Sequence, residues 1–71
     1  MYKFIMNHMG EFTLVAYHKG IAILKNLNRF GTQYVGSRSF DFKTNEWNHG
    51  HYFKDEEDAL EWFEKEVKSD E

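Results

Sequence analysis

The feature that most constrains this chain is an amphipathic segment at residues 55–67, which follows an aromatic stretch directly. Asp55 can cap the start of a helix, and Asp58 stands three positions later, as in a capping box. The apolar residues that recur at helical spacing are Ala59, Leu60, Phe63 and Val67. The residues on the opposite side are Glu57, Glu61, Glu64, Lys65 and Lys68, with acids four positions before bases. The segment therefore predicts a helix that buries one face.

The residues before this helix have the composition and spacing of β-strands. Segments rich in β-branched and aromatic residues, separated by polar or glycine-containing turns, lie at 2–6, 12–18, 33–42 and 47–53. The segment at 21–27 fits both a strand and a helix, because its apolar spacing satisfies either period. We predict one α+β domain over residues 1–71: an antiparallel sheet of four to five strands, built from two hairpins, with one C-terminal amphipathic helix packed on one face.

The second hairpin sets the expected position of the aromatic residues. A turn centred on residues 44–45, with Asn45 in the left-handed conformation, places Phe42 opposite Trp47. The same register places Gly36 opposite Phe53, and a glycine inside the strand at 33–42 suggests a bulge at Gly36.

The first hairpin, with its turn at residues 19–20, predicts a sheet that is partly apolar on both sides. One face would hold Phe12, Leu14, Ala16, Ile21, Ile23 and Leu27. The other would hold Val15, Tyr17, Ala22 and Leu24. One helix covers one face, so the other must meet a second copy, another protein or a nucleic acid, or the sheet must curl and bury both faces on itself. If the uncovered face meets a second copy, the protein is a homodimer.

Charge is strongly polarised along the chain. Residues 55–71 contain nine acids and two lysines, a net charge of −7, whereas residues 1–54 contain seven bases and three acids, a net charge of +4. Two interpretations of these acids are open: a helix face that is only solvated, or a surface that engages a basic site of a partner that normally holds nucleic acid. In the alternative function, the mildly basic sheet binds single strands by stacking, with Arg38 and Lys25 near phosphates. The candidate partner-binding residues are Glu57, Glu61, Glu64, Arg38, Phe40, Trp47 and His49.

No residue set in the sequence predicts catalysis, a cofactor or a metal. His49 and His51 share a strand face, but no cysteine is present and no carboxylate stands at a supporting spacing. The serines lack a nucleophile-elbow sequence, and no phosphate-binding loop is present. No apolar run approaches the length of a membrane span, and the N-terminus does not have the pattern of a signal peptide. We therefore expect a non-enzymatic cytoplasmic protein with no membrane partner.

The segment "YVGSRSFDFKTNEWNHGHYFKDEEDALEWF" resembles small proteins from phages and mobile elements of Gram-positive bacteria. Those proteins join a long strand, a polar turn and a "W-x-x-G-x-Y-F" strand to a helix of "E-E-A-L-x-x-F" type, with Asp58 here where glutamate is frequent. Size, acidity and the lack of a catalytic set are similar to those of anti-CRISPR proteins. The resemblance implies a phage-encoded inhibitor that blocks a nucleic-acid-handling host protein, such as a CRISPR effector. We expect no direct binding of nucleic acid, because the acidic helix belongs to the same small molecule. It transfers no residue role.

Overall fold

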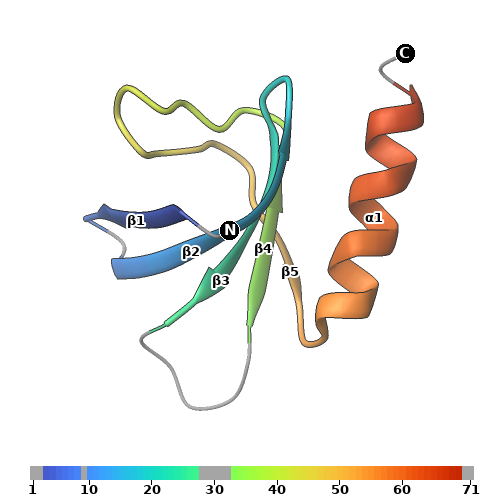
Figure 1. Cartoon of the computed structure of the whole chain (residues 1–71), viewed down its shortest axis with the longest axis horizontal. Coiled ribbons are helices and arrows are strands. Elements are labelled where there is room, and N and C mark those ends of the chain that lie inside the picture. The colour runs from blue at the N-terminus through green and yellow to red at the C-terminus, as the bar shows by residue number, and fades with distance from the viewer. Residues whose placement is uncertain (1–2, 9, 28–32, 70–71) are drawn as a thin grey trace.

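The computed structural model describes residues 3–8, 10–27 and 33–69, and shows a five-stranded antiparallel sheet with one helix packed against it (Figure 1). The elements are β1 (Lys3–Asn7), β2 (Gly10–His18), β3 (Ile21–Asn26), β4 (Tyr34–Ser37), β5 (His51–Phe53) and α1 (Glu56–Ser69). The strands lie side by side in chain order. The predicted α+β class is confirmed, and the segment at 21–27 is a strand. The turn expected at 28–31 and the start of the strand expected at 2–6 lie outside the described residues.

The turn of the first hairpin forms where the sequence predicts it. Lys19 and Gly20 have φ angles of 46° and 89°, so both central residues adopt the positive φ that a tight hairpin turn requires. His18 pairs with Ile21 across the turn, as expected for a two-residue connection.

A bulge changes the rest of this hairpin. The register shifts between Leu14 and Ala16, so that Leu14 pairs with Leu24 instead of Lys25. A one-residue shift moves every following side chain to the other face of a strand. Phe12 and Leu14 therefore lie on the face opposite to that of Ala16, and the predicted grouping of these three residues is wrong.

The second hairpin is much shorter than predicted. β4 and β5 contain four and three residues, and Gly36 pairs with His51, not with Phe53. Beyond these strands, Asp41 and Glu46 form an isolated bridge around a four-residue turn. The turn is thus centred one residue earlier than predicted, and each residue of β4 pairs with a partner two residues earlier. The pairing shift is even, so the side chains of β4 and β5 keep their predicted faces. Phe40 and Trp47 do not, because the prediction groups them with Phe53, whereas they lie with Val35 in a cluster on the other side of the sheet.

Residues 38–50 leave the sheet because hydrogen bonds from side chains replace the backbone hydrogen bonds between strands. The Ser37 and Ser39 hydroxyls both donate to the Asn48 carbonyl at 3.0 Å, and the Asn48 amide donates to the Ser39 hydroxyl at 3.0 Å. The Phe40 amide donates to the Gly20 carbonyl at 3.0 Å. Hydroxyl groups that bond to the backbone in this way compete with regular sheet pairing. The strand predicted over 33–42 therefore ends early, and the strand predicted over 47–53 begins late.

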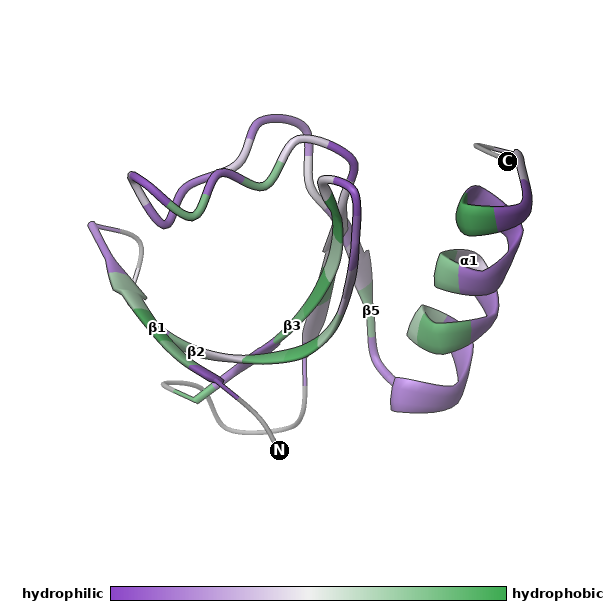
Figure 2. Cartoon of the chain, turned by 45° about the horizontal axis from the view of Figure 1, so that its top comes forward, coloured by the Kyte–Doolittle hydropathy of each residue, from purple (hydrophilic) through white to green (hydrophobic). Residues whose placement is uncertain are grey.

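The sheet curls, and its two sides carry separate apolar clusters. We call the side enclosed by the curl the inner side and the side that faces α1 the outer side. The inner cluster contains Ile5, Phe12, Ala22, Leu24, Val35 and Phe40, with Leu14 and Trp47 against it. The outer cluster contains Ile23, Tyr34 and Ala59, with Val15, Ala16, Phe53, Leu60, Trp62 and Phe63 against it. Figure 2 shows residues 38–50 crossing above the inner side and the apolar side of α1 turned toward the sheet.

The sequence left two alternatives for the sheet face that the helix does not cover: contact with a partner, or burial by the sheet itself. The structure has the second. The inner side is closed by the curl and by Phe40 and Trp47 from residues 38–50. The Trp47 ring meets the Phe12 ring edge-on, with centroids 5.1 Å apart.

The helix docks through a contact that depends on a glycine. A Cβ atom at Gly36 would lie 2.7 Å from Cζ3 and 2.8 Å from Cε3 of Trp62, closer than carbon atoms approach. The Trp62 ring also packs at a tilt against the rings of His51 and Phe53, with centroids 5.3 Å and 5.9 Å away. Gly36 therefore serves close approach of the helix, where the sequence suggested a bulge.

Candidate functional site

The structure separates the two surfaces that the sequence offers for partner binding. Three carboxylates of α1 remain exposed, and we call Glu57, Glu61 and Glu64 the acidic helix face. They lie on the side of α1 away from Ala59, which is fully buried against the sheet. Lys65 and Lys68 are also exposed, and Lys65 Nζ lies 3.7 Å from Glu61 Oε1. The negative charge is therefore most concentrated over the first two turns of the helix.

The start of the helix adds to this charge. Asp55 directly precedes α1, and its carbonyl accepts a hydrogen bond from the Ala59 amide at 3.2 Å. Glu56, Glu57 and Asp58 form an acidic first turn. Carboxylates at this end of a helix interact favourably with the helix dipole, which offsets part of their mutual repulsion.

Arg38 belongs to the helix surface and not to a stacking platform. Its Nη1 forms an ion pair with Oε1 of Glu66, on the flank of α1. Both side chains are partly exposed, so the pair contributes little stability, but it places the guanidinium beside an acidic helix. The sequence could not show this pairing, because Glu66 is 28 residues away and its position depends on how the helix docks.

The aromatic candidates do not form an open surface. Phe40 is 5% exposed and lies in the inner cluster, and Trp47 packs against it with centroids 6.3 Å apart. His49 is exposed, with a φ of 53°, at a bend before β5. The structure therefore does not bring Phe40, Trp47 and His49 together on one accessible face.

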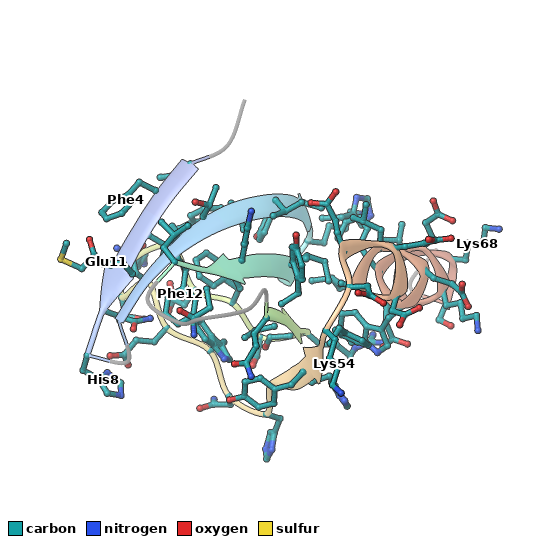
Figure 3. All side chains as sticks on the ribbon, turned by 90° about the horizontal axis from the view of Figure 1, so that it is seen from below. Phe4, His8, Glu11, Phe12, Lys54 and Lys68 are labelled. Atoms are coloured by element: carbon teal, nitrogen blue, oxygen red, sulfur yellow. The ribbon has the colours of Figure 1, made fainter. Side chains whose placement is uncertain are left out.

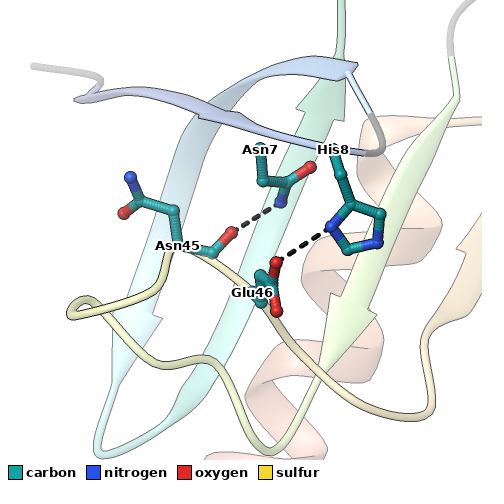
Figure 4. Close-up of polar contacts among 4 residues, drawn as sticks. All are labelled: Asn7, His8, Asn45 and Glu46. Carbon is teal, nitrogen blue, oxygen red and sulfur yellow. Dashed lines mark hydrogen bonds and ion pairs between the residues drawn. The ribbon is translucent and has the colours of Figure 1, made fainter.

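Polar contacts between distant segments hold residues 38–50 in place (Figure 4). Asn7 Nδ2 donates to the Asn45 carbonyl at 2.5 Å, and His8 Nδ1 lies 2.9 Å from Glu46 Oε2. Asn45 has a φ of 58°, the left-handed conformation that the sequence predicted. These contacts join the end of β1 to the turn at 42–45, so Phe40 and Trp47 are held over the inner side.

The described part of the chain offers no grouped ligands for a metal ion. Within residues 3–8, 10–27 and 33–69, no three histidine, cysteine, aspartate or glutamate side chains come together. In the same residues, α1 is too short and too polar to cross a membrane. Comparison with models of known protein families, with curated proteins and with solved structures finds no match.

Proposed function

We propose that this protein is a small non-enzymatic binding protein whose acidic helix face docks on a basic surface of a partner protein. The partner's surface is one that otherwise holds nucleic acid, so the protein acts as an inhibitor by occupying it. The observation that supports this proposal is that Glu57, Glu61 and Glu64 stay exposed while the aromatic candidates are used in packing.

The spacing of the carboxylates suits such a role. A rise of about 1.5 Å per residue separates successive carboxylates of the acidic helix face by about 4.5–6 Å along the helix axis. Lysine and arginine side chains that track phosphates can meet a row of carboxylates on a rigid helix by charge complementarity. These three residues do not serve docking, since the packed side of α1 is formed by Ala59, Trp62 and their apolar neighbours.

The same observations weigh against direct binding of single strands. Arg38 is engaged by Glu66, and Phe40 is buried, so a stacking platform would require residues 38–50 to leave the inner side. A strongly acidic helix on the same small molecule also repels phosphates.

The experiment compares the parent with a variant in which Glu57, Glu61 and Glu64 are all changed to Gln. Glutamine keeps the side-chain length and the helix propensity, so circular dichroism should show an unchanged fold. The two proteins are immobilised and exposed to lysate of the source organism, with and without excess oligonucleotide. We expect proteins that the parent retains, that the oligonucleotide displaces and that the triple variant loses. For such a partner, loss of three interfacial carboxylates should weaken binding by at least about tenfold.

A matched control changes Lys65 and Lys68 to Gln on the same helix. This variant removes exposed charges but makes the helix more acidic, so it should bind at least as well as the parent. If the triple variant retains the same proteins as the parent, the acidic helix face only solvates the helix and the proposal is wrong.

A further inference from the structure

At one rim of the sheet, β1 uses a single edge for strand pairing in the described part of the chain. It pairs with β2, and among the described residues α1 makes no contact with it. Figure 3 shows Phe4 of β1 on the outer side of the sheet, whereas Phe12 of β2 points into the space that the curl encloses. The second edge of β1 is therefore the place to ask which backbone groups remain unpaired.

A hydrogen bond on the far side of β2 shows which backbone groups point out from this edge. The Leu27 amide donates to the Glu11 carbonyl at 2.9 Å, so the backbone groups of Glu11 point away from β1. Met6 pairs with Glu11, and an antiparallel pair of this kind exchanges no hydrogen bonds. The amide and carbonyl of Met6 therefore point away from β2. Because the orientation repeats at every second residue of a strand, the amide and carbonyl of Phe4 do so as well.

These two amides and two carbonyls have no hydrogen-bond partner within residues 3–8, 10–27 and 33–69. We call them the open edge of β1. Residues 38–50 contact β1 through the side chains of Lys3 and Asn7, which share the inner side of the strand with Ile5. Phe4 and Met6 are on the outer side and are 52% and 56% exposed. Another strand could therefore approach the open edge from solvent.

The open edge is also poorly protected against pairing. Edge strands are usually guarded by a proline, a bulge or a central charge, or they are very short. The chain contains no proline, and β1 pairs with β2 in regular register over five residues. The one charged residue of β1 is Lys3, at its first position, so the central residues Phe4–Met6 are all apolar. At the opposite rim of the sheet, β5 has three residues.

We propose that the open edge of β1 binds an extended segment of a partner protein as an additional strand of the sheet. Such a segment satisfies all four backbone groups together, which gives affinity that depends little on its sequence. Its alternate side chains would lie beside Phe4 and Met6, so apolar residues at every second position should be preferred. The open edge is on a strand that α1 does not contact, so this proposal does not depend on the proposed function.

The size of the open edge favours an extended segment over a second folded copy. Stable complexes between folded proteins bury about 800 Å² on each partner. β1 has five residues, and the two large side chains beside its open edge are already about half buried. An extended segment needs no larger surface, because its backbone hydrogen bonds supply the affinity. For a short peptide we expect a Kd on the order of 0.1–1 mM.

Hydrogen exchange of the whole chain, followed by nuclear magnetic resonance, tests the geometry of the free protein. The Ile5 amide points toward β2, whereas the amides of Phe4 and Met6 point to solvent. The amides of Phe4 and Met6 should therefore exchange at least about tenfold faster than that of Ile5. Equal protection of all three amides would mean that the open edge is already paired, which overturns the proposal.

The binding probe is a soluble peptide in which threonine and valine alternate between two terminal lysines. At concentrations up to about 2 mM it should shift the amide resonances of β1 in a saturable way and slow exchange at Phe4 and Met6. The matched probe is the same peptide with every amide between the lysines N-methylated. It keeps the side chains and the charge but loses its backbone donors, so it should bind at least about tenfold more weakly.

A pair of variants separates the backbone from the side chain at one position. Met6→Pro removes an outward amide that the sheet does not use, so circular dichroism should be unchanged while the peptide binds at least about tenfold more weakly. Met6→Thr keeps the amide and should change the affinity by less than about threefold. If Met6→Pro does not fold, the comparison of the two peptides on the parent still decides.

Three results would overturn the proposal. The first is that the unmodified peptide leaves the resonances of β1 unshifted at about 2 mM, and the second is that both peptides bind equally, since backbone pairing then contributes nothing. The third is that the parent alone associates through β1 at about 1 mM, because the occupant of the open edge is then a second copy.

Discussion

Substituting Gly36 with alanine tests how the helix docks. The added Cβ would lie 2.7 Å from Cζ3 of Trp62 and 3.2 Å from Cε2 of Phe53. Trp62 cannot simply move aside, because its ring is packed against the rings of His51 and Phe53. We therefore expect the substitution to push α1 away from the sheet and to destabilise the protein.

The magnitude follows from two opposing effects. Overpacking a filled site costs about 1–3 kcal/mol. Alanine also restricts the unfolded chain, which returns about 0.4–1 kcal/mol. The net loss of unfolding free energy should thus be about 1–2 kcal/mol, which lowers the melting temperature of a domain this small by about 5–15 °C.

The assay is thermal and urea unfolding followed by far-ultraviolet circular dichroism, repeated in a Trp62→Leu background. If the indole ring causes the penalty, Gly36→Ala should cost almost nothing once the ring is gone, and the double-mutant cycle should return a coupling close to the single-variant loss. An alanine variant as stable as the parent, or one that loses the same free energy in both backgrounds, would refute the reasoning.

Two further predictions concern residues 38–50 and the first hairpin. Phe40→Ala should lower the free energy of unfolding in urea by about 3–5 kcal/mol, because the side chain fills the inner cluster. Phe42 is 40% exposed, so Phe42→Ala should lower it much less. Equal losses for the two variants would place Phe40 outside the core. Gly20→Ala should lower stability by about 1–2 kcal/mol in thermal unfolding, because φ is 89° and the new Cβ would lie 3.2 Å from the Arg38 carbonyl oxygen. Gly20→Asn should restore part of that loss, and an alanine variant with unchanged stability would contradict the argument.

The sequence predicts elements whose signals are local. The helix follows from its capping residue and its apolar stripe, and the tight turn follows from Lys19 and Gly20, whose positive φ angles suit a short connection. The exposure of Glu57, Glu61 and Glu64 follows from the same 3.6-residue spacing. These features need no knowledge of distant residues, which is why the fold class is correct.

Features that depend on distant partners could not be predicted. The bulge between Leu14 and Ala16 contains no glycine or proline to mark it, yet it reverses the faces of Phe12 and Leu14. The early end of β4 and the late start of β5 depend on serine hydroxyls that bond to the Asn48 backbone, as described above. For the candidate site, the consequence is large: the aromatic residues became core, and the acidic residues remained surface.

The position of β3 between the two apolar clusters gives the molecule two levels of stability. Residues 21–24 are all buried, with Ile23 in the outer cluster and Leu24 in the inner one. Detachment of α1 opens the outer cluster but leaves β3 paired on both edges, so the helix can open in a local fluctuation while the inner cluster persists. We therefore expect amide hydrogens of β3 to exchange only when the whole molecule unfolds. The acidic helix face is thus carried on the layer that can separate first, so the surface that we propose for binding could adjust while the inner cluster stays folded.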